Sequence, residues 1–275
     1  MKPASFDFLC PETLEEALLA LADGGGDARV IAGGQSLVPM LNMRLARPAL
    51  LIDIMRLETL RRVETSGDEI VVGAGVRQAE LEARPNLSRD LPLVAAALPW
   101  LGHVQTRARG TVCGSIAHAD PSAELSLSLV TLEGAVSLRS SKQKRKVAAD
   151  DFFIGMMATN LVEGEMIEAV HFPRAQPGSG YAFREVGRRH GDFAIVACAA
   201  VADRKGLRLG IAGVDDRPRV FPLPALDDNQ FDDAINDIAW SLNARDDIHA
   251  SARYRRELVR NLGRETLKEA IRCRA

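Results

Sequence analysis

The chain has 275 residues, 47% of them hydrophobic and 26% charged, which is typical of a globular protein long enough for more than one packed unit. This composition excludes a disordered or low-complexity chain. With 35 Lys and Arg against 37 Asp and Glu, the formal net charge of −2 gives no general attraction for nucleic acid or for an anionic membrane.

The amino-terminal part of the chain, about residues 1–56, is predicted to alternate short strands with helices. The hydroxyl of Thr13 can cap a helix, which a run of three glycines, Gly24–Gly26, brings to an end. A shorter helix is expected to run through Leu41. Apolar runs free of turn formers predict the strands, which are Phe6–Leu9, Arg29–Ala32 and Leu50–Ile54.

The rest of the chain divides at a segment rich in turn formers, Arg174–Gly180. Before it, residues 57–176 are predicted to contain helices around Leu91–Leu98 and Leu125–Leu132 and strands near Ile70–Gly73, Ala135–Leu138 and Met166–Phe172. After it come β-rich runs, Tyr181–Val186, Ala194–Ala202 and Leu207–Val214, and then helices from about Asp232. Strands followed by helices predict a smaller α+β domain over residues 177–275.

The cysteines and the amino-terminal residues bear on the cellular compartment. The four cysteines lie far apart and have neither the spacing of a metal site nor that of a dense disulfide framework. No secretory signal is recognised, and the longest apolar run, Ala194–Ala202, is less than half the length of a membrane span. A reduced, cytoplasmic protein without membrane insertion is therefore expected.

Two glycine-containing loops are the candidate binding elements. The first, Ala32-Gly33-Gly34-Gln35-Ser36-Leu37, lies between a predicted strand and a helix, and its glycines let successive N–H groups converge on an anion such as a diphosphate. The second is Gly110-Thr111-Val112-Cys113-Gly114-Ser115, and the downstream carboxylate of Glu124 can bind a ribose or ribityl hydroxyl. Either loop alone is equally consistent with an ordinary turn, so the pair is the stronger signal.

These loops, with Pro39 after the first and Ala119-Asp120-Pro121 after the second, resemble the FAD-binding medium subunit of molybdenum hydroxylases. That family includes carbon monoxide dehydrogenase, nicotine dehydrogenase and the central region of xanthine dehydrogenase. A third segment, Gly187–Ala194, is also similar, and the resemblance spans nearly the whole chain. It implies an α+β FAD-binding fold of the vanillyl-alcohol oxidase type over residues 1–176, with subdomains of about 1–56 and 57–176, followed by the carboxy-terminal domain.

The resemblance also implies which residues contact FAD. Carried over position by position, they are Val30, Ile31, Ala32, Gly33, Gly34, Gln35, Ser36, Leu37, Leu101, Thr111, Val112, Cys113, Gly114, Ser115, Glu124, Ile167, Arg184 and Phe193. Phe193 matches an aromatic position near the isoalloxazine ring in some members.

Two of these positions are informative about how the cofactor is held. Cys113 stands where the family usually has a second glycine, so the approach of that peptide to the cofactor is in question. Gln35 stands where related flavin oxidases often carry a histidine that is covalently linked to the flavin. Because glutamine cannot form that link, FAD is expected to be held noncovalently.

Other motifs are interpreted as structural. Ile70–Gly75 looks like a strand entering a dinucleotide fingerprint, but Gln78 occupies the third glycine position and Pro85 interrupts the helix, so a Rossmann NAD site is not expected. The basic run Lys142–Lys146 is typical of a solvated hairpin, and nucleic-acid binding is not expected. The five histidines have no metal-ligand spacing.

The function implied by the resemblance is that of an oxidoreductase subunit. Substrate would be hydroxylated at the molybdenum cofactor of a large molybdopterin-binding subunit. Electrons would pass through the [2Fe-2S] clusters of a small iron–sulfur subunit to FAD on this chain, and on to an external acceptor, in a dimer of heterotrimers. No catalytic residue is expected here. Two alternatives stay open, a stand-alone flavin-dependent oxidase or dehydrogenase of the same fold and a non-catalytic flavin-binding protein.

Overall fold

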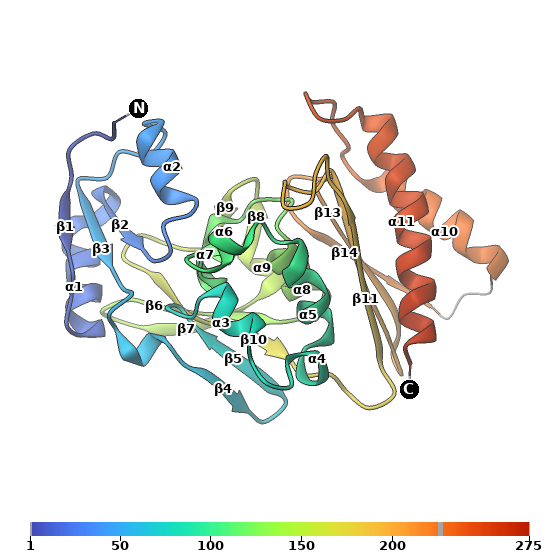
Figure 1. Cartoon of the computed structure of the whole chain (residues 1–275), viewed down its shortest axis with the longest axis horizontal. Helices are drawn as coiled ribbons and strands as arrows, with labels where there is room; N and C mark the ends of the chain where they lie inside the picture. The colour runs from blue at the N-terminus through green and yellow to red at the C-terminus, as the bar shows by residue number, and fades with distance from the viewer. Residues whose placement is uncertain (1, 225–227, 275) are drawn as a thin grey trace.

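The computed structural model describes residues 2–224 and 228–274, and its main sheets follow one another along the chain (Figure 1). The first sheet has three parallel strands in the order β1-β3-β2. Its elements are β1 (Asp7–Leu9), α1 (Leu14–Gly24), η1 (Gly25–Asp27), β2 (Ala28–Ile31), α2 (Leu37–Asn42) and β3 (Leu50–Asp53). The predicted cap of α1 is confirmed, since the Glu16 amide donates to the Thr13 Oγ1 at 3.1 Å.

The second sheet has five antiparallel strands in the order β4-β5-β10-β6-β7. Its strands are β4 (Val63–Ser66), β5 (Glu69–Gly73), β6 (Ala135–Arg139), β7 (Lys144–Ala148) and β10 (Met166–Pro173), and β8 (Phe153–Gly155) and β9 (Ala158–Thr159) form a separate pair. Because β5 has antiparallel neighbours on both sides, it cannot open the parallel unit of a Rossmann site, as predicted.

Short helices connect these strands and cover the second sheet (Figure 1). They are η2 (Glu58–Leu60), α3 (Gln78–Glu82), α4 (Leu87–Asp90), α5 (Pro92–Ala97), η3 (Leu98–Trp100), α6 (Val104–Arg107), α7 (Val112–His118), α8 (Glu124–Thr131) and α9 (Ala149–Phe152). All eight residues of α8 are buried, which indicates that it lies inside the molecule rather than on its surface.

The third sheet has four antiparallel strands, β11 (Gly180–Val186), β12 (Val196–Asp203), β13 (Gly206–Ala212) and β14 (Arg219–Leu223). It lies between α8 on one face and the two last helices, α10 (Asp228–Ser241) and α11 (Ala252–Arg272), on the other (Figure 1). Alternate residues of β12 therefore belong to two different core clusters, Ala199 to one and Cys198 to the other. Burial on both faces explains why this strand was predicted from an unbroken apolar run.

The contact between α8 and the third sheet is close. A Cβ on Gly210 of β13 would overlap the Thr131 Oγ1 and would lie 2.9 Å from the Leu127 Cδ1. Leu127 and Thr131 of α8 therefore face this sheet, and so does Glu124, which is on the same helical face one turn earlier. Within residues 2–224 and 228–274, no helix combines the length and the apolar character that crossing a membrane requires.

Candidate functional site

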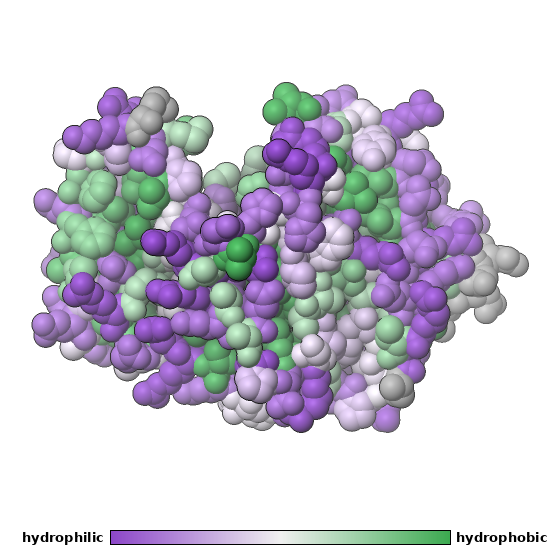
Figure 2. Space-filling model, viewed as in Figure 1, coloured by the Kyte–Doolittle hydropathy of each residue, from purple (hydrophilic) through white to green (hydrophobic). Residues whose placement is uncertain are grey.

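A cavity of about 860 Å³ lies between the loop that follows β2 and the loop that precedes α7. Its lining also includes Gly25 and Arg29 from the amino-terminal part of the chain and Gly191 and Phe193 from the carboxy-terminal part. The outline of the molecule is notched between the amino-terminal lobe and the rest (Figure 2). A cavity of this size is in the range of cofactor sites.

The first glycine loop offers free backbone donors to this cavity. Among the described residues, the amides of Gly33, Gly34, Gln35 and Ser36 donate to no protein acceptor. Gly34 has a φ of +70°, which a residue with a side chain rarely adopts. The Gln35 Nε2 donates to the Gly33 carbonyl at 3.1 Å and so helps to fix the loop. Consecutive unpaired N–H groups are suited to hold a phosphate.

The two loops are in direct contact, and Gly33 makes this possible. A Cβ on Gly33 would overlap the Arg109 carbonyl oxygen and would lie 2.6 Å from the Gly110 Cα. The second loop is held in turn by the segment before α3, because the Gln78 amide donates to the Gly110 carbonyl at 2.8 Å and the Val112 amide to the Val76 carbonyl at 3.0 Å. The glycine at position 33 is therefore required by loop packing, whatever the ligand.

The second loop begins α7 with a capping interaction. The Thr111 Oγ1 accepts a hydrogen bond from the Gly114 amide at 3.0 Å, and a Cβ on Gly114 would lie only 2.6 Å from that oxygen. Thr111 is thus a helix cap as well as a residue of the cavity wall.

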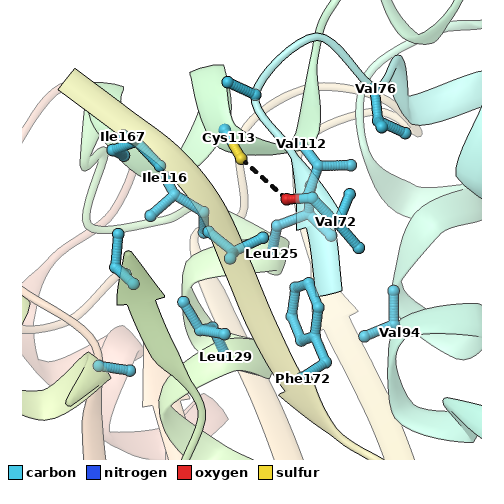
Figure 3. Packing of buried hydrophobic residues seen from close by; sticks show 14 of the residues in the cluster. Val72, Val76, Val94, Val112, Cys113, Ile116, Leu125, Leu129, Ile167 and Phe172 are labelled. Atoms are coloured by element: carbon cyan, nitrogen blue, oxygen red, sulfur yellow. Dashed lines mark hydrogen bonds between the residues drawn. The ribbon is translucent and has the colours of Figure 1, made fainter. Parts of the chain in front are cut away.

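Cys113 places its thiol in the core. Its Sγ donates to the Val72 carbonyl at 3.4 Å, and apolar side chains such as Val112 and Ile116 surround it (Figure 3). Burial raises the pKa of this thiol to about 12, so it is inert at neutral pH. Since the thiol points to Val72, the departure from glycine at this position is accommodated inside the protein.

Glu124, the first residue of α8, is a carboxyl group of the cavity wall with 5% of its surface exposed. Burial raises its pKa to about 7, its own backbone N–H works in the opposite direction, and the charge of Asp120 raises the pKa further. At neutral pH a large fraction of Glu124 is therefore protonated. In that form it can donate as well as accept a hydrogen bond.

The structure brings most of the predicted contact residues together. The cavity is lined by Val30, Ile31, Ala32, Gly33, Gly34, Gln35, Ser36, Leu37, Leu101, Thr111, Cys113, Gly114, Ser115, Glu124, Ile167 and Phe193. Of these residues, Phe193 is 62% exposed.

Two predicted contacts, Val112 and Arg184, do not line this cavity. The side chain of Val112 is completely buried in the core (Figure 3). Arg184 points from β11 to α11, where its Nη2 lies 2.8 Å from the Glu269 Oε2. Its guanidinium thus joins β11 to α11 by an ion pair.

Arg29 and Gln78 are among the polar wall residues that sequence reasoning missed. The Arg29 Nη1 is anchored on the carbonyls of Gly26 at 2.9 Å and Ala28 at 2.8 Å, at the start of β2. Gln78 is 4% exposed, and its Oε1 has no hydrogen-bond partner among the described residues. A buried acceptor of this kind is expected to accept a hydrogen bond from a bound ligand. The only sequence signal for Gln78 was its place in the rejected dinucleotide motif.

These features fit FAD. The free amides suit a diphosphate, the carboxyl of Glu124 and the Gln78 Oε1 suit hydroxyl groups, and the largely apolar side chains of the wall suit a flavin ring.

Comparison with known proteins agrees with this site. The chain belongs to the family described as the FAD binding domain in molybdopterin dehydrogenase, which its residues 4–175 match. The predicted family, the α+β fold and FAD as the cofactor are thereby confirmed.

The similarity to individual relatives extends over the whole chain. It is 37% identical to the 6-hydroxypseudooxynicotine dehydrogenase complex subunit alpha of Paenarthrobacter nicotinovorans, covering 98% of this chain and 96% of that protein. To the nicotine 6-hydroxylase medium subunit of the same organism it is 36% identical, covering 98% and 99%. It superimposes on carbon monoxide dehydrogenase from Hydrogenophaga pseudoflava with a TM-score of 0.95 and 29% identity over 100% of both chains.

Denaturation of the protein is expected to release the flavin as chemically unchanged FAD. Gln35 lines the cavity where a histidyl link would form, and an amide side chain cannot make that bond. Acid precipitation of the purified chain should release all yellow colour into the supernatant, with FAD identified there by chromatography. Flavin absorbance that stays with the washed pellet would contradict noncovalent binding.

Proposed function

We propose that this chain is the FAD-carrying electron-transfer subunit of a multi-subunit molybdenum hydroxylase, passing electrons from iron–sulfur clusters to an external acceptor. The observation that carries the proposal is the cavity between the two loops, in a chain that is similar from end to end to medium subunits of such dehydrogenases. The protein is thus an oxidoreductase subunit.

The residues of the chain bind and orient the cofactor. In this proposal the amides of Gly33–Ser36 hold the diphosphate, and Glu124 and Gln78 bind hydroxyl groups. Leu101 and Phe193 supply apolar surface for the ring. When bound, FAD supplies the capacity to accept electrons and to deliver them singly or in pairs. No residue of this chain needs to contact the organic substrate, so none is assigned a catalytic role.

The partners in this proposal are a large molybdopterin-binding subunit and a small subunit with [2Fe-2S] clusters, assembled as a dimer of heterotrimers. The names of two relatives, a subunit alpha of a dehydrogenase complex and a medium subunit, support assembly with other chains. Residues 1–176 would be the FAD-binding domain, with subdomains of about 1–56 and 57–176, and residues 177–275 the carboxy-terminal domain. Each main sheet takes its strands from one of these stretches.

A cytoplasmic location is part of the proposal. All four cysteines are free, including the exposed Cys273, which fits a reducing compartment.

The proposed function predicts in which protein preparations an organic substrate reduces the flavin. The purified chain, reconstituted with FAD under anaerobic conditions, should lose flavin absorbance with dithionite but not with N-heterocycles or aldehydes. The complex co-purified with its two partner subunits should contain molybdenum and iron, and its flavin should be reduced by the substrate of the complex. Bleaching of the isolated chain by an organic substrate would instead support a stand-alone flavoenzyme.

A further inference from the structure

Arg145, in the basic run of the β6–β7 hairpin, lies on the inner face of the second sheet. On β7, Lys144 and Lys146 are exposed, whereas Arg145 is half-buried and pairs in register with Leu138, which is completely buried. Successive side chains of a strand point to opposite faces, so Arg145 is directed toward the covered side of the sheet. This residue of the basic run is therefore not part of a solvated surface.

The Arg145 guanidinium binds both ends of a loop, residues 160–165, which is called the wall loop below. Its Nε and Nη2 donate to the two carboxylate oxygens of Glu165 at 2.8 and 2.7 Å. Its Nη1 donates to the Asn160 Oδ1 at 2.7 Å, and its Nη2 also donates to the Asn160 carbonyl at 2.6 Å. The guanidinium holds the pKa of Glu165 below its usual range, so this carboxylate is ionised at neutral pH. A bidentate pair of this kind fixes geometry as well as charge.

The same carboxylate closes a turn inside the wall loop. The Val162 amide donates to the Glu165 Oε2 at 3.2 Å, and the Glu165 amide donates to the Val162 carbonyl at 3.1 Å. Gly164 occupies the third position of this turn with a φ of +78°, a conformation that favours glycine there. The shape of the turn therefore depends on Glu165, and the position of Glu165 depends on Arg145.

The wall loop is part of the cavity wall. Residues 161–165 all line the cavity, whereas Arg145 does not. The turn of the loop lies against η1, because a Cβ on Gly25 would be 3.1 Å from the Glu163 Oε1. The wall loop therefore joins the second sheet to the amino-terminal lobe beside the cavity.

The wall loop and the amides assigned to the diphosphate are separated by the length of β2. Gly25, which contacts the wall loop, precedes this strand, and Gly33–Ser36 follow it. A strand of four residues spans about 13 Å. The wall loop therefore faces a part of the ligand other than the diphosphate.

The residues assigned to the flavin ring, Leu101 and Phe193, lie on the side of the second glycine loop. A Cβ on Gly191, two positions before Phe193, would be 3.0 Å from the Gly102 carbonyl oxygen. Gly102 directly follows Leu101, and this segment continues into the second loop, which contacts Gly33. With the ring on that side and the diphosphate at the first loop, the part of FAD that remains for the wall loop is its adenosine half.

We propose that Arg145 is a positioning residue for FAD, which holds the wall loop against the adenosine half of the cofactor without contacting the cofactor itself. This inference rests on the proposed function, because it assumes that FAD occupies the cavity with its ring at Leu101 and Phe193. Among the described residues, the amides of Glu163 and Gly164 donate to no protein acceptor, so the turn offers them to a ligand. Without the guanidinium, the buried carboxylate that closes this turn would lose its partner and its orientation.

The test measures the dissociation constants of FAD, ADP and FMN for the full-length apoprotein by isothermal titration calorimetry. Arg145→Met keeps an apolar stem and removes the hydrogen-bond donors. It should bind FAD and ADP more weakly than the wild type by about tenfold or more, whereas the affinity for FMN, which lacks the adenosine half, should change by less than about twofold. Arg145→Lys keeps a charge beside Glu165 but cannot bind Asn160 as well, so it should recover only part of the loss.

The matched control is Arg139→Met. Arg139 lies on β6, next to β7 in the sheet (Figure 1), and pairs with Glu168 at 3.2 Å, and neither residue lines the cavity. Its side chain is 34% exposed against 30% for Arg145, so the loss of a paired arginine from the sheet is comparable in the two variants. Arg139→Met should bind all three ligands as the wild type does.

The outcomes separate this inference from the proposed function. Unchanged FAD affinity in Arg145→Met, equal losses of ADP and FMN affinity, or the same loss in Arg139→Met would overturn the role of Arg145 and leave the FAD site intact. A wild type that binds no FAD would refute the proposed function itself. If Arg145→Met does not fold, the ratio of FAD affinity to FMN affinity in Arg145→Lys decides. This ratio should fall by about threefold or more, and an unchanged ratio would overturn the inference.

Discussion

Among the substitutions of a single glycine by alanine in this chain, Gly33→Ala is expected to cause the largest loss of FAD binding. The new Cβ would overlap the Arg109 carbonyl oxygen and would crowd the Gly110 Cα at 2.6 Å. The two loops would have to move apart, and overpacking of this kind costs about 1–3 kcal/mol. Affinity should fall by about fivefold to more than a hundredfold. The measurement is FAD bound per chain after reconstitution, together with a fluorescence titration.

The matched control is Gly155→Ala. A Cβ at Gly155 would have its nearest neighbours, the Ala158 Cβ and the Asp216 Oδ2, at 3.9 Å, and this residue does not line the FAD cavity. It should bind FAD as the wild type does. If Gly33→Ala retained full affinity while remaining folded, the contact between the two loops would not be needed for the site.

The second large effect concerns stability and pH. Glu185 binds its proton more tightly in the folded chain, where burial raises its pKa from 4.5 to about 8. Between these two values the folded state holds more protons than the unfolded state, so the free energy of unfolding falls as the pH rises through this range. Below pH 4.5 the full contribution is present, and above pH 8 it is lost.

Glu185→Gln removes this dependence, because glutamine does not ionise. The variant should gain stability over the wild type as the pH increases from 5 to 8.5, by on the order of 4 kcal/mol at most, since a tenfold change in proton affinity corresponds to about 1.4 kcal/mol. Urea unfolding at both pH values, with the exposed Glu163→Gln as control, measures the difference. An equal stability difference at pH 5 and pH 8.5 would show that Glu185 does not titrate in the folded protein.

The sequence was most informative where local chemistry alone decides the structure. The cap at Thr13 and the doubly buried strand β12 were both predicted, because a hydroxyl before a helix and a long apolar run have few other interpretations. The strands β4 and β14 were missed. Both are edge strands in which exposed and charged residues are tolerated, and β14 contains Pro222.

The same distinction holds for the site. The glycine loops were visible in the sequence and belong to the cavity wall, as do most residues carried over with them. Gln78 and Glu185 could not be predicted, because their importance comes from burial without a partner, which depends on elements distant in sequence. Arg184 is the opposite case. The resemblance matched it to a cofactor contact, whereas its guanidinium forms an ion pair with Glu269 of α11.

The cavity wall combines segments from separate parts of the fold, since Ala32–Leu37 follow strand β2 of the first sheet and Thr111–Ser115 lie among the helices that cover the second. A ligand that contacts both acts as a cross-link between them without any covalent bond. Mass action then adds the binding energy to the stability of the folded chain, by about 4 kcal/mol at a free ligand concentration of 1,000 times Kd. Because proteases cleave the opened chain, a chain that has bound FAD should be cleaved more slowly than the empty one.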